Sequence, residues 1–501
     1  MVSVLTVSLS LVAVDGPAVP VAQAAGTATA KSTATAKPSS PTLDWKSCPD
    51  APKLQCARLR APLDRLQPKG EGVSLAVVRL RAGKPKRRRG VLLVNPGGPG
   101  ASGRLFAIQL ARNPLLNRIA DVYDIVGWDP RGVGQSVPIR CLDPRSYDRY
   151  FAADPTPDNG AERDALAAVS REFVKGCVSR NGAILEHVAT PDTVADMELL
   201  RVALGEQRIS FLGFSYGTYL GAKFADAYPS RVDRFVLDGA LDPLATNESR
   251  VTLQAEGFER ALASFLASCA KNCGFVSKGE SPIAAFDRLS ASIDAKAVVV
   301  GSGNSARLVG PGEFTTAVLA GLYNVDFGWP RLREALNRLA AGNGKPLLAL
   351  FDLYADRGPN GDYRNTSDAN AATNCTDIAY PASEAEYHRL AAALTKKFPR
   401  FGAFAAYSTY LCSFWPQRGP APSAVVAKGA PPILVVGTTR DPATPYVWAK
   451  SLRNQLPGSV LLTYDSDGHT AYLTANRCIR AEVEAFLLRG KLPKSGTICR
   501  R

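Results

Sequence analysis

The pentapeptide at residues 213–217 reads Gly-Phe-Ser-Tyr-Gly and fits the pattern G-x-S-x-G. It lies between an apolar run at 209–212 and a helical pattern at 218–228. This order of strand, tight turn and helix is typical of a nucleophile elbow, which holds a serine hydroxyl above a sheet. Glycines flank the serine because a side chain there would collide with the backbone of the strained turn. The sequence therefore predicts a nucleophilic Ser215 on a sheet of alternating strands and helices.

A serine hydroxyl needs a general base, and the chain of 501 residues contains three histidines: His187, His388 and His469. Hydrolases with this elbow place the histidine last, after the nucleophile and the carboxylate, which disfavours His187. His388 lies in an amphipathic helical pattern, where a solvated surface histidine is expected. His469 follows a strand-like stretch at 460–464 and a polar turn. We therefore expect His469 to be the base, on a loop at the carboxyl end of a strand.

A carboxylate must orient the histidine and stabilise the imidazolium, and Asp441 is the candidate. The run 432–437 has the composition of a buried parallel strand, and Asp441 lies in the loop that follows it. The alternative reading is an aspartate that only starts the turn before Pro442. Asp465 and Asp467 compete for the role, but they are so near His469 in sequence that we expect them to shape its turn.

Acyl transfer also needs an oxyanion hole, made by the backbone N–H after the nucleophile and a second N–H from an earlier loop. The strand at 90–94 runs into Asn-Pro-Gly-Gly-Pro-Gly at 95–100. We expect the N–H groups of Tyr216 and Gly98 to form the hole, with Gly97 as the next candidate. A phosphate-binding loop is disfavoured because no Lys-Ser or Lys-Thr follows the glycines.

Four blocks together resemble the secreted tripeptidyl aminopeptidase branch of the alpha/beta hydrolases, relatives of the prolyl aminopeptidases of actinomycetes. The blocks are residues 95–103, 128–136, 213–221 and 437–445, and they extend over most of the chain after residue 44. The resemblance implies an alpha/beta hydrolase fold, a mostly parallel sheet flanked by helices. It implies a serine exopeptidase without a cofactor that releases tripeptides or short units from peptides with a free N-terminus.

Two residues depart from the pattern of the proline aminopeptidases. Asn95 begins the oxyanion loop where those enzymes usually have His, and Thr470 follows the base where Gly is common. The first difference favours the tripeptidyl branch. The second leaves the expected triad intact but affects the local shape of the base loop.

The spacing of the motifs divides the chain into four parts. These are a signal-like and low-complexity segment at 1–43, the first part of the hydrolase body at 44–243, a helical lid at 244–430 and the second part of the body at 431–501. Amphipathic patterns in the lid predict helices at 258–270, 283–295, 331–341 and 384–397. A lid of this kind can supply a carboxylate for the substrate ammonium group, and the sequence leaves four candidates open: Glu248, Glu313, Asp326 and Asp377.

Three further acidic or basic residues are interpreted as structural. Asp129 and Arg131 are expected to form a buried pair that shapes the loop after the strand at 123–127. Asp238 is expected to end the strand after the nucleophile helix.

The N-terminus indicates export. An apolar run at 1–14 precedes Ala-Gln-Ala at 22–24, a cleavage signature, although no Lys or Arg precedes the run; the alternative is a disordered tail. No other stretch approaches about 18 uninterrupted apolar residues, so no transmembrane span is expected. The chain has ten cysteines, an even number that with three histidines does not resemble a metal site. We expect short-range disulfides: Cys48–Cys56, Cys141–Cys177, Cys269–Cys273, Cys375–Cys412 and Cys478–Cys499.

The net charge of +15 and the basic run at 84–89 raise the question of nucleic-acid binding. The run lies between two apolar strands, where a solvated loop tip is the ordinary explanation, so no nucleic-acid partner is expected. In an exported enzyme the excess charge favours association with anionic cell-wall polymers.

Together these residues predict acyl transfer through an acyl-enzyme. An esterase of the same fold is the alternative, because the triad does not distinguish esters from amides. A catalytically silent binding protein on the cell surface is the alternative from another class.

Overall fold

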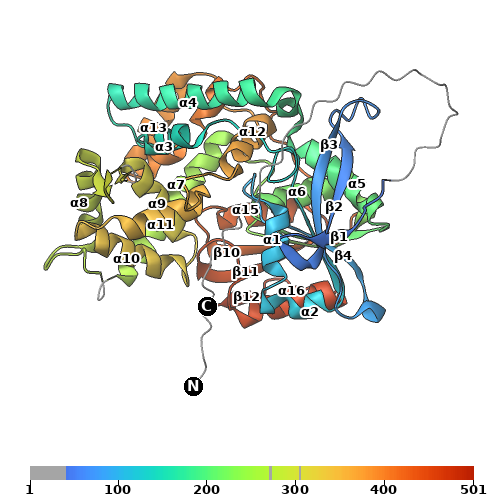
Figure 1. Ribbon diagram of the computed structural model, residues 1–501. Coiled ribbons are helices and arrows are strands. Elements are labelled where there is room, and N and C mark those ends of the chain that lie inside the picture. Colours follow the sequence, from blue (N-terminus) through green and yellow to red (C-terminus); the bar gives the residue numbers. More distant parts are fainter. Residues whose placement is uncertain (1–40, 270–272, 304–305) are drawn as a thin grey trace, which may run out of the picture. The chain divides into compact units, whose positions relative to one another are not determined.

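The computed structural model describes residues 41–269, 273–303 and 306–501 (Figure 1). The expected signal segment lies almost wholly outside these residues. The helices in the described part of the chain are all too short or too polar to cross a membrane.

A ten-stranded sheet forms the centre of the described chain. Its order is β1-β2-β3-β5-β4-β6-β7-β10-β11-β12; the first three neighbouring pairs are antiparallel and all later pairs are parallel. The strands are Lys46–Cys48, Ala51–Pro62, Gly72–Leu80, Gly90–Asn95, Tyr123–Trp128, Ile209–Phe214, Val232–Asp238, Leu434–Arg440, Val460–Asp467 and Ile498–Arg500 for β1–β7 and β10–β12. The predicted alpha/beta hydrolase fold with its mostly parallel sheet is confirmed.

Alternate residues of the parallel strands enter two separate apolar cores. In β4, Val91 and Leu93 belong to the core that contains α5, α6 and α15, whereas Leu92 and Val94 belong to the core that contains α1 and α16. Side chains of a strand point to opposite faces in turn, so the continuous apolar runs reflect burial of both faces. The helices of this part are Gly103–Leu110, Asn117–Ala120, Pro144–Ala152, Gly160–Asn181, Thr190–Ala203, Tyr216–Ala227, Tyr446–Gln455 and Arg477–Arg489 for α1–α6, α15 and α16.

Helices dominate the described chain between β7 and β10. They are Asn247–Ser268, Pro282–Ala295, Pro311–Leu322, Gly328–Ala340, Lys345–Ala355, Thr366–Asp377, Glu384–Lys397 and Gly402–Tyr407 for α7–α14, with a small hairpin of β8 (Val298–Val300) and β9 (Arg307–Val309). The predicted helices coincide with α8, α10 and α13 within three residues, whereas α7 begins eleven residues earlier than expected. In Figure 1 the helices α3 and α4, which the sequence placed in the body, lie beside α12 and α13, and Arg171 of α4 pairs with Glu384 of α13.

All five expected disulfides are present. Cys48 lies in β1 and Cys499 in β12, so a disulfide is attached to each edge strand of the large sheet. Cys478, the disulfide partner of Cys499, lies near the start of α16.

The expected pair between Asp129 and Arg131 is wrong. Arg131 forms a bidentate ion pair with Asp196 of α5, with N–O distances of 2.7 and 2.8 Å, and both side chains are buried. Asp129 instead accepts hydrogen bonds from the Ser102 hydroxyl and from backbone N–H groups, including that of Gln135. The two residues point to different neighbours, so each stabilises the loop after β5 separately.

The basic run at 84–89 is exposed, as expected of a loop tip, but it is partly neutralised. Lys84 pairs with Asp121, and Arg88 pairs with Asp124 and Glu206. These ion pairs hold the connection between β3 and β4 against the α/β body.

Candidate active site

Ser215 lies at the sharp turn between β6 and α6. Its φ of 55° and ψ of −124° lie outside the regions that L-residues prefer, and its N–H donates to the carbonyl oxygen of Asp238 at 2.9 Å. A Cβ added to Gly213 would lie 2.5 Å from the carbonyl oxygen of Gly217, and one added to Gly217 would lie 2.9 Å from that of Asn95. Both glycines are therefore required by close backbone contact, as the pentapeptide predicts.

His469 lies in the loop after β11, next to Asp441 in the loop after β10. Its Nδ1 is 2.9 and 3.0 Å from the two carboxylate oxygens of Asp441, which is fully buried. Burial of the ring acts to lower the pKa of His469, but the charge and hydrogen bond of Asp441, together with the charge of Asp238, outweigh it and raise this pKa. The site thus stabilises the imidazolium form, as a general base requires.

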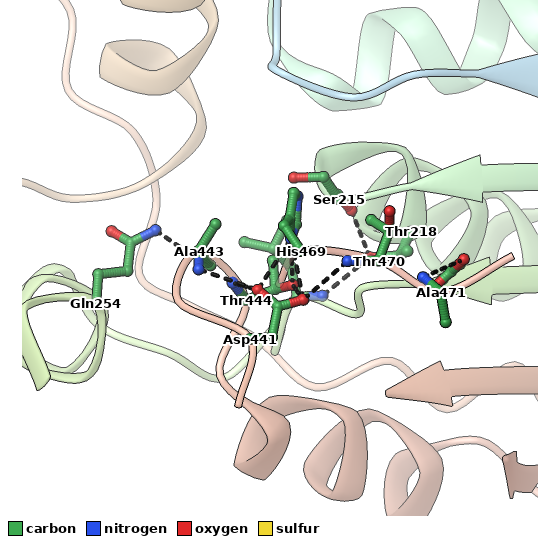
Figure 2. Close-up of polar contacts among 11 residues, drawn as sticks. Ser215, Thr218, Gln254, Asp441, Ala443, Thr444, His469, Thr470 and Ala471 are labelled. Atoms are coloured by element: carbon green, nitrogen blue, oxygen red, sulfur yellow. Dashed lines mark hydrogen bonds and ion pairs between the residues drawn. The ribbon is translucent and has the colours of Figure 1, made fainter. Parts of the chain in front are cut away.

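Figure 2 shows the Ser215 hydroxyl and the His469 ring next to each other, with Asp441 on the opposite side of the ring. In the described part of the chain the Ser215 hydroxyl donates no hydrogen bond. Catalytic hydrogen bonds are often long in ligand-free sites and tighten when substrate binds. The structure therefore brings together the three residues that the sequence selected for the triad.

Asp441 is held by the residues that follow it. The N–H groups of Ala443 and Thr444 donate to its Oδ1 at 3.0 and 2.9 Å, and the Thr444 hydroxyl donates to Oδ2 at 2.9 Å. The Thr444 oxygen also lies 3.2 Å from Nδ1 of His469. Sequence reasoning did not identify Thr444, although its position three residues after Asp441 in the block at 437–445 was a usable signal.

Thr470 occupies the position where relatives of the proline aminopeptidases commonly have Gly. It adopts a left-handed conformation with φ of 65°, which is costly for a β-branched residue, on the order of 1–3 kcal/mol. Its N–H donates to Oδ2 of Asp441 at 3.2 Å. The base loop therefore keeps a glycine-like shape without glycine.

The loop after β4 lies against the nucleophile. A Cβ added to Gly97 would lie 2.4 Å from the carbonyl oxygen of Phe214 and 3.0 Å from the backbone nitrogen of Tyr216. The N–H of Gly97 donates to the side-chain oxygen of Asn95 at 2.9 Å. By contrast, neither Gly98 nor Tyr216 donates a backbone hydrogen bond within the described residues.

The competing residues have other partners. Asp465 and Asp467 both pair with Arg440, each at 2.9 Å. His388 is half-buried rather than fully solvated: its Nδ1 lies 2.7 Å from the Tyr407 hydroxyl, and burial lowers its pKa. It lines a cavity of about 840 Å³ among α8, α9, α13 and α14 whose lining includes no residue of the expected triad.

His187 has a structural contact of its own. It ends a 3₁₀ turn at Gly182–His187, and its carbonyl oxygen accepts a hydrogen bond from Arg131 at 3.1 Å. His469 is therefore the histidine that lies beside Ser215 (Figure 2).

Sequence reasoning interpreted Asp238 only as the end of a strand. It does end β7, but its buried carboxylate also accepts the N–H groups of Ala471, at 3.0 Å, and Tyr472, at 2.7 Å, in the loop that follows His469. Burial raises the pKa of Asp238 to about 6. One residue therefore contacts both the nucleophile and the base loop.

The fold and this constellation define a serine hydrolase of the alpha/beta hydrolase class. The family described as TAP-like protein matches residues 396–499. The chain is 33% identical to tripeptidyl aminopeptidase of Streptomyces lividans over 475 residues, covering 91% of this chain and 86% of that protein. It is 35% identical to serine protease Hip1 of Mycobacterium tuberculosis, covering 91% of each chain. The chain therefore belongs to this family of serine peptidases.

The same family includes a protein with a different name. Carboxylesterase B of Mycobacterium tuberculosis is 33% identical over 480 residues, covering 92% of this chain and 90% of that protein. Among solved structures, proline iminopeptidase of Mycobacterium smegmatis is similar at 14% identity and a TM-score of 0.35, covering 86% of this chain and 98% of that one, which is too distant to add to the assignment.

Proposed function

We propose that the chain is an exported aminopeptidase that cleaves tripeptides or short units from the free N-terminus of peptides. The observation that carries the catalytic assignment is the contact of His469 with buried Asp441 on one side and its place beside Ser215 on the other (Figure 2). His469 accepts the proton of Ser215, whose oxygen attacks the scissile carbonyl carbon. His469 then protonates the leaving amine, and water resolves the acyl-enzyme by the same route.

The oxyanion is held by the N–H groups of Tyr216 and Gly98. Tyr216 begins α6 directly after Ser215, Gly98 lies in the loop after β4, and the N–H groups of both are without a backbone acceptor in the described chain. Gly97 is excluded from this role because its N–H is already used by the side chain of Asn95. Asn95, which stands where the proline aminopeptidases usually have His, thus helps to determine which backbone N–H is available to the oxyanion.

The helical segment at 244–430 acts as the lid that restricts the site to chain ends. It contacts the loops that carry the site: the side-chain amide of Asn370 in α12 donates to the carbonyl oxygen of Pro99, and that of Gln254 in α7 donates to the carbonyl oxygen of Ala443, each at 2.9 Å. A cover fixed at these points restricts access to the site, as an enzyme that acts on chain ends requires.

Asp377 is the carboxylate of the lid that binds the substrate ammonium group. Its oxygens accept the N–H and hydroxyl of Thr190, whose hydroxyl is hydrogen-bonded to that of Tyr216, the residue after the nucleophile. Burial raises the pKa of Asp377 to about 6, which leaves the carboxylate mostly charged at pH 7.

The other three candidates are less suitable for binding an ammonium group. Glu313 accepts the N–H of Gly310 at the start of its own helix, Asp326 pairs with Arg501, and Glu248 is an exposed residue in the first turn of α7. None of these contacts connects its carboxylate to a neighbour of Ser215, as Thr190 connects Asp377 to Tyr216.

Export is supported by the Ala-Gln-Ala signature at 22–24 and by five disulfides, which persist in oxidising compartments. Association with anionic wall polymers rests on the net charge of +15 alone. Loss of cell association at high salt would support it, and salt-insensitive association would contradict it.

An esterase acting on small acyl esters is the second candidate function. The relative named carboxylesterase B, similar over 92% of this chain, favours it. The catalytic residues are the same for both reactions, so the leaving group and the lid decide between them.

Four chromogenic substrates separate the two functions: a free-amine tripeptide anilide, its N-acetylated form, a proline anilide and a small acyl ester. We expect the purified protein to cleave the free tripeptide, and Ser215→Ala to abolish this activity. Turnover of the ester alone would reject the peptidase proposal and leave the triad in place. Activity retained by Ser215→Ala would reject the nucleophile.

A further inference from the structure

The helical segment between β7 and β10 reaches the base of the site itself. Tyr323 follows the last residue of α9, and its carbonyl oxygen accepts the backbone N–H of His469 at 2.7 Å. A Cβ added to Gly468 would lie 3.3 Å from the same oxygen. The main chain of the base loop is therefore fixed against the end of a lid helix.

The side chain of Tyr323 makes a second contact with the same residue. Its ring lies edge to face with the imidazole of His469, with ring centroids 5.3 Å apart and an interplanar angle of 87°. The same ring packs near Phe258 of α7, at a centroid distance of 5.8 Å. The tyrosine ring thus contacts both a lid helix and the imidazole.

The imidazole has neighbours on several sides. Asp441 lies at Nδ1, and a Cβ added to Gly239 at the end of β7 would lie 3.2 Å from Cε1. The Tyr323 ring supplies a further wall, and only 11% of the His469 side chain is exposed. A rotation of the ring away from Ser215 would have to displace one of these groups.

We infer that Tyr323 is a positioning residue that holds the imidazole of His469 in the orientation required for proton transfer with Ser215. This inference rests on the proposed role of His469 as the base. It gives the lid a role in the chemical step in addition to covering the substrate. A lid that moved away would also release the base.

The part of Tyr323 that contacts His469 is its ring, whereas its hydroxyl group interacts with Tyr354. The Tyr323 ring lies near that of Tyr354 in α11, with centroids 6.0 Å apart, and the two hydroxyl groups influence each other's pKa. Burial raises the pKa of Tyr323 well above its usual value, so the ring stays neutral. The charged groups that face His469 are then Asp441, from the loop after β10, and Asp238, at the end of β7.

The test compares three variants with the wild type on the small acyl ester and the tripeptide anilide. We expect Tyr323→Ala to lower kcat on both substrates by about 10- to 100-fold, part of the 10²- to 10⁴-fold contribution of a general base, with KM within about twofold. Tyr323→Phe keeps the ring and should retain kcat within about twofold. Tyr354→Phe is the matched control, since it removes the neighbouring hydroxyl group and leaves the contact of Tyr323 with His469 in place.

The pH profile separates positioning from a general loss of structure. Water that enters beside the ring relieves its desolvation, which by itself raises the pKa of His469, but it also weakens the larger, opposite effect of Asp441, so the raised pKa should return downward toward its ordinary value. The acid limb of kcat/KM should therefore move to lower pH in Tyr323→Ala. Labelling of Ser215 with a fluorophosphonate gives the fraction of active sites, to which kcat is normalised.

Unchanged kcat per labelled site together with an unchanged acid limb would overturn the inference. If Tyr323→Ala does not fold, Tyr323→Leu decides, because it keeps an apolar contact with Phe258 but lacks the flat ring; wild-type kcat in that variant would also overturn it. Ester turnover without peptide turnover in the wild type would reject the proposed exopeptidase activity. The role of Tyr323 would still be tested, because the variants can be compared on the ester alone.

Discussion

The backbone N–H of Ser215 donates a 2.9 Å hydrogen bond to the carbonyl oxygen of Asp238. The carboxylate of the same aspartate accepts the N–H groups of Ala471 and Tyr472, which follow the base. A single residue at the end of β7 therefore contacts both the turn that carries Ser215 and the loop that carries His469. It also places a second buried carboxylate near the imidazole of His469.

Asp238→Asn should move the acid limb of the pH profile of kcat/KM to lower pH. The charge of Asp238 raises the pKa of His469, so its removal lowers that pKa, while the asparagine oxygen can still accept a backbone N–H. The matched control is Asp465→Asn, which alters an aspartate paired with Arg440 and should leave the limb in place. A limb that stays fixed or moves to higher pH in Asp238→Asn would contradict this electrostatic role.

Gly97→Ala should lower kcat by about 10²- to 10³-fold, the usual effect of losing one oxyanion donor. The added Cβ would crowd the Tyr216 nitrogen at 3.0 Å, and φ of 93° adds backbone strain. Gly90→Ala is the control: Gly90 begins β4, the strand before the Gly97 loop, and has a φ of 131°, but its Cβ would meet only the Glu206 side chain at 3.6 Å. Equal losses in the two variants would assign the effect to strain alone.

Asp377→Asn should raise KM for the free-amine tripeptide anilide by about tenfold or more, because a buried ion pair with the ammonium group is lost. Hydrolysis of the small acyl ester, which has no ammonium group, should change less than twofold. Asp326→Asn serves as the control, since Asp326 is exposed and pairs with Arg501. A uniform loss on both substrates would indicate that Asp377 only supports the elbow through Thr190.

The melting temperature should rise as pH falls from 7 toward 5. Burial raises the pKa values of Asp238, Asp368 and Asp377 to about 6, above the unfolded value of 3.8. Between these values the folded state binds protons that the unfolded state does not, so stability increases on acidification. Lowered pKa values, as at Glu280, act at more acidic pH, near 2 to 4.5.

Asp368→Asn isolates one of these groups. Asp368 is fully buried, accepts the N–H of Cys141 at 2.8 Å and the Tyr147 hydroxyl, and its second oxygen has no hydrogen-bond partner among the described residues. Calorimetry between pH 5 and 7.5 should show a flatter profile in the variant than in the wild type. A profile parallel to that of the wild type would mean that Asp368 does not titrate in this range.

The sequence was sufficient where local pattern and chemistry coincide. The elbow around Ser215, the apolar parallel strands and the loops of Asp441 and His469 all carry short-range signals, and the even cysteine count anticipated the disulfides. The contacts of Arg131 and Asp238 could not be predicted from the sequence, because tertiary packing, and not the spacing of residues along the chain, brings their partners near.

The helix α12 illustrates the same limit. Its sequence at Thr366–Asp377 is polar and rich in alanine, without a wide apolar stripe, so no helix was expected there. Yet it packs on the oxyanion loop: a Cβ on Gly100 would lie 2.5 Å from the carbonyl oxygen of Thr366. Small side chains allow this close approach, and their weak periodicity is the reason that the helix is hard to recognise.

Each edge of the large sheet is a strand of only three residues, β1 or β12, that carries a disulfide cysteine. Short edge strands limit pairing between molecules, because they offer few free backbone groups. Behind them lie longer strands, β2 with twelve residues and β11 with eight. Reduction of Cys48–Cys56 and Cys478–Cys499 would release the two short edge strands, which cover β2 and β11. The resistance of this protein to edge-to-edge aggregation is therefore coupled to the redox state of its surroundings.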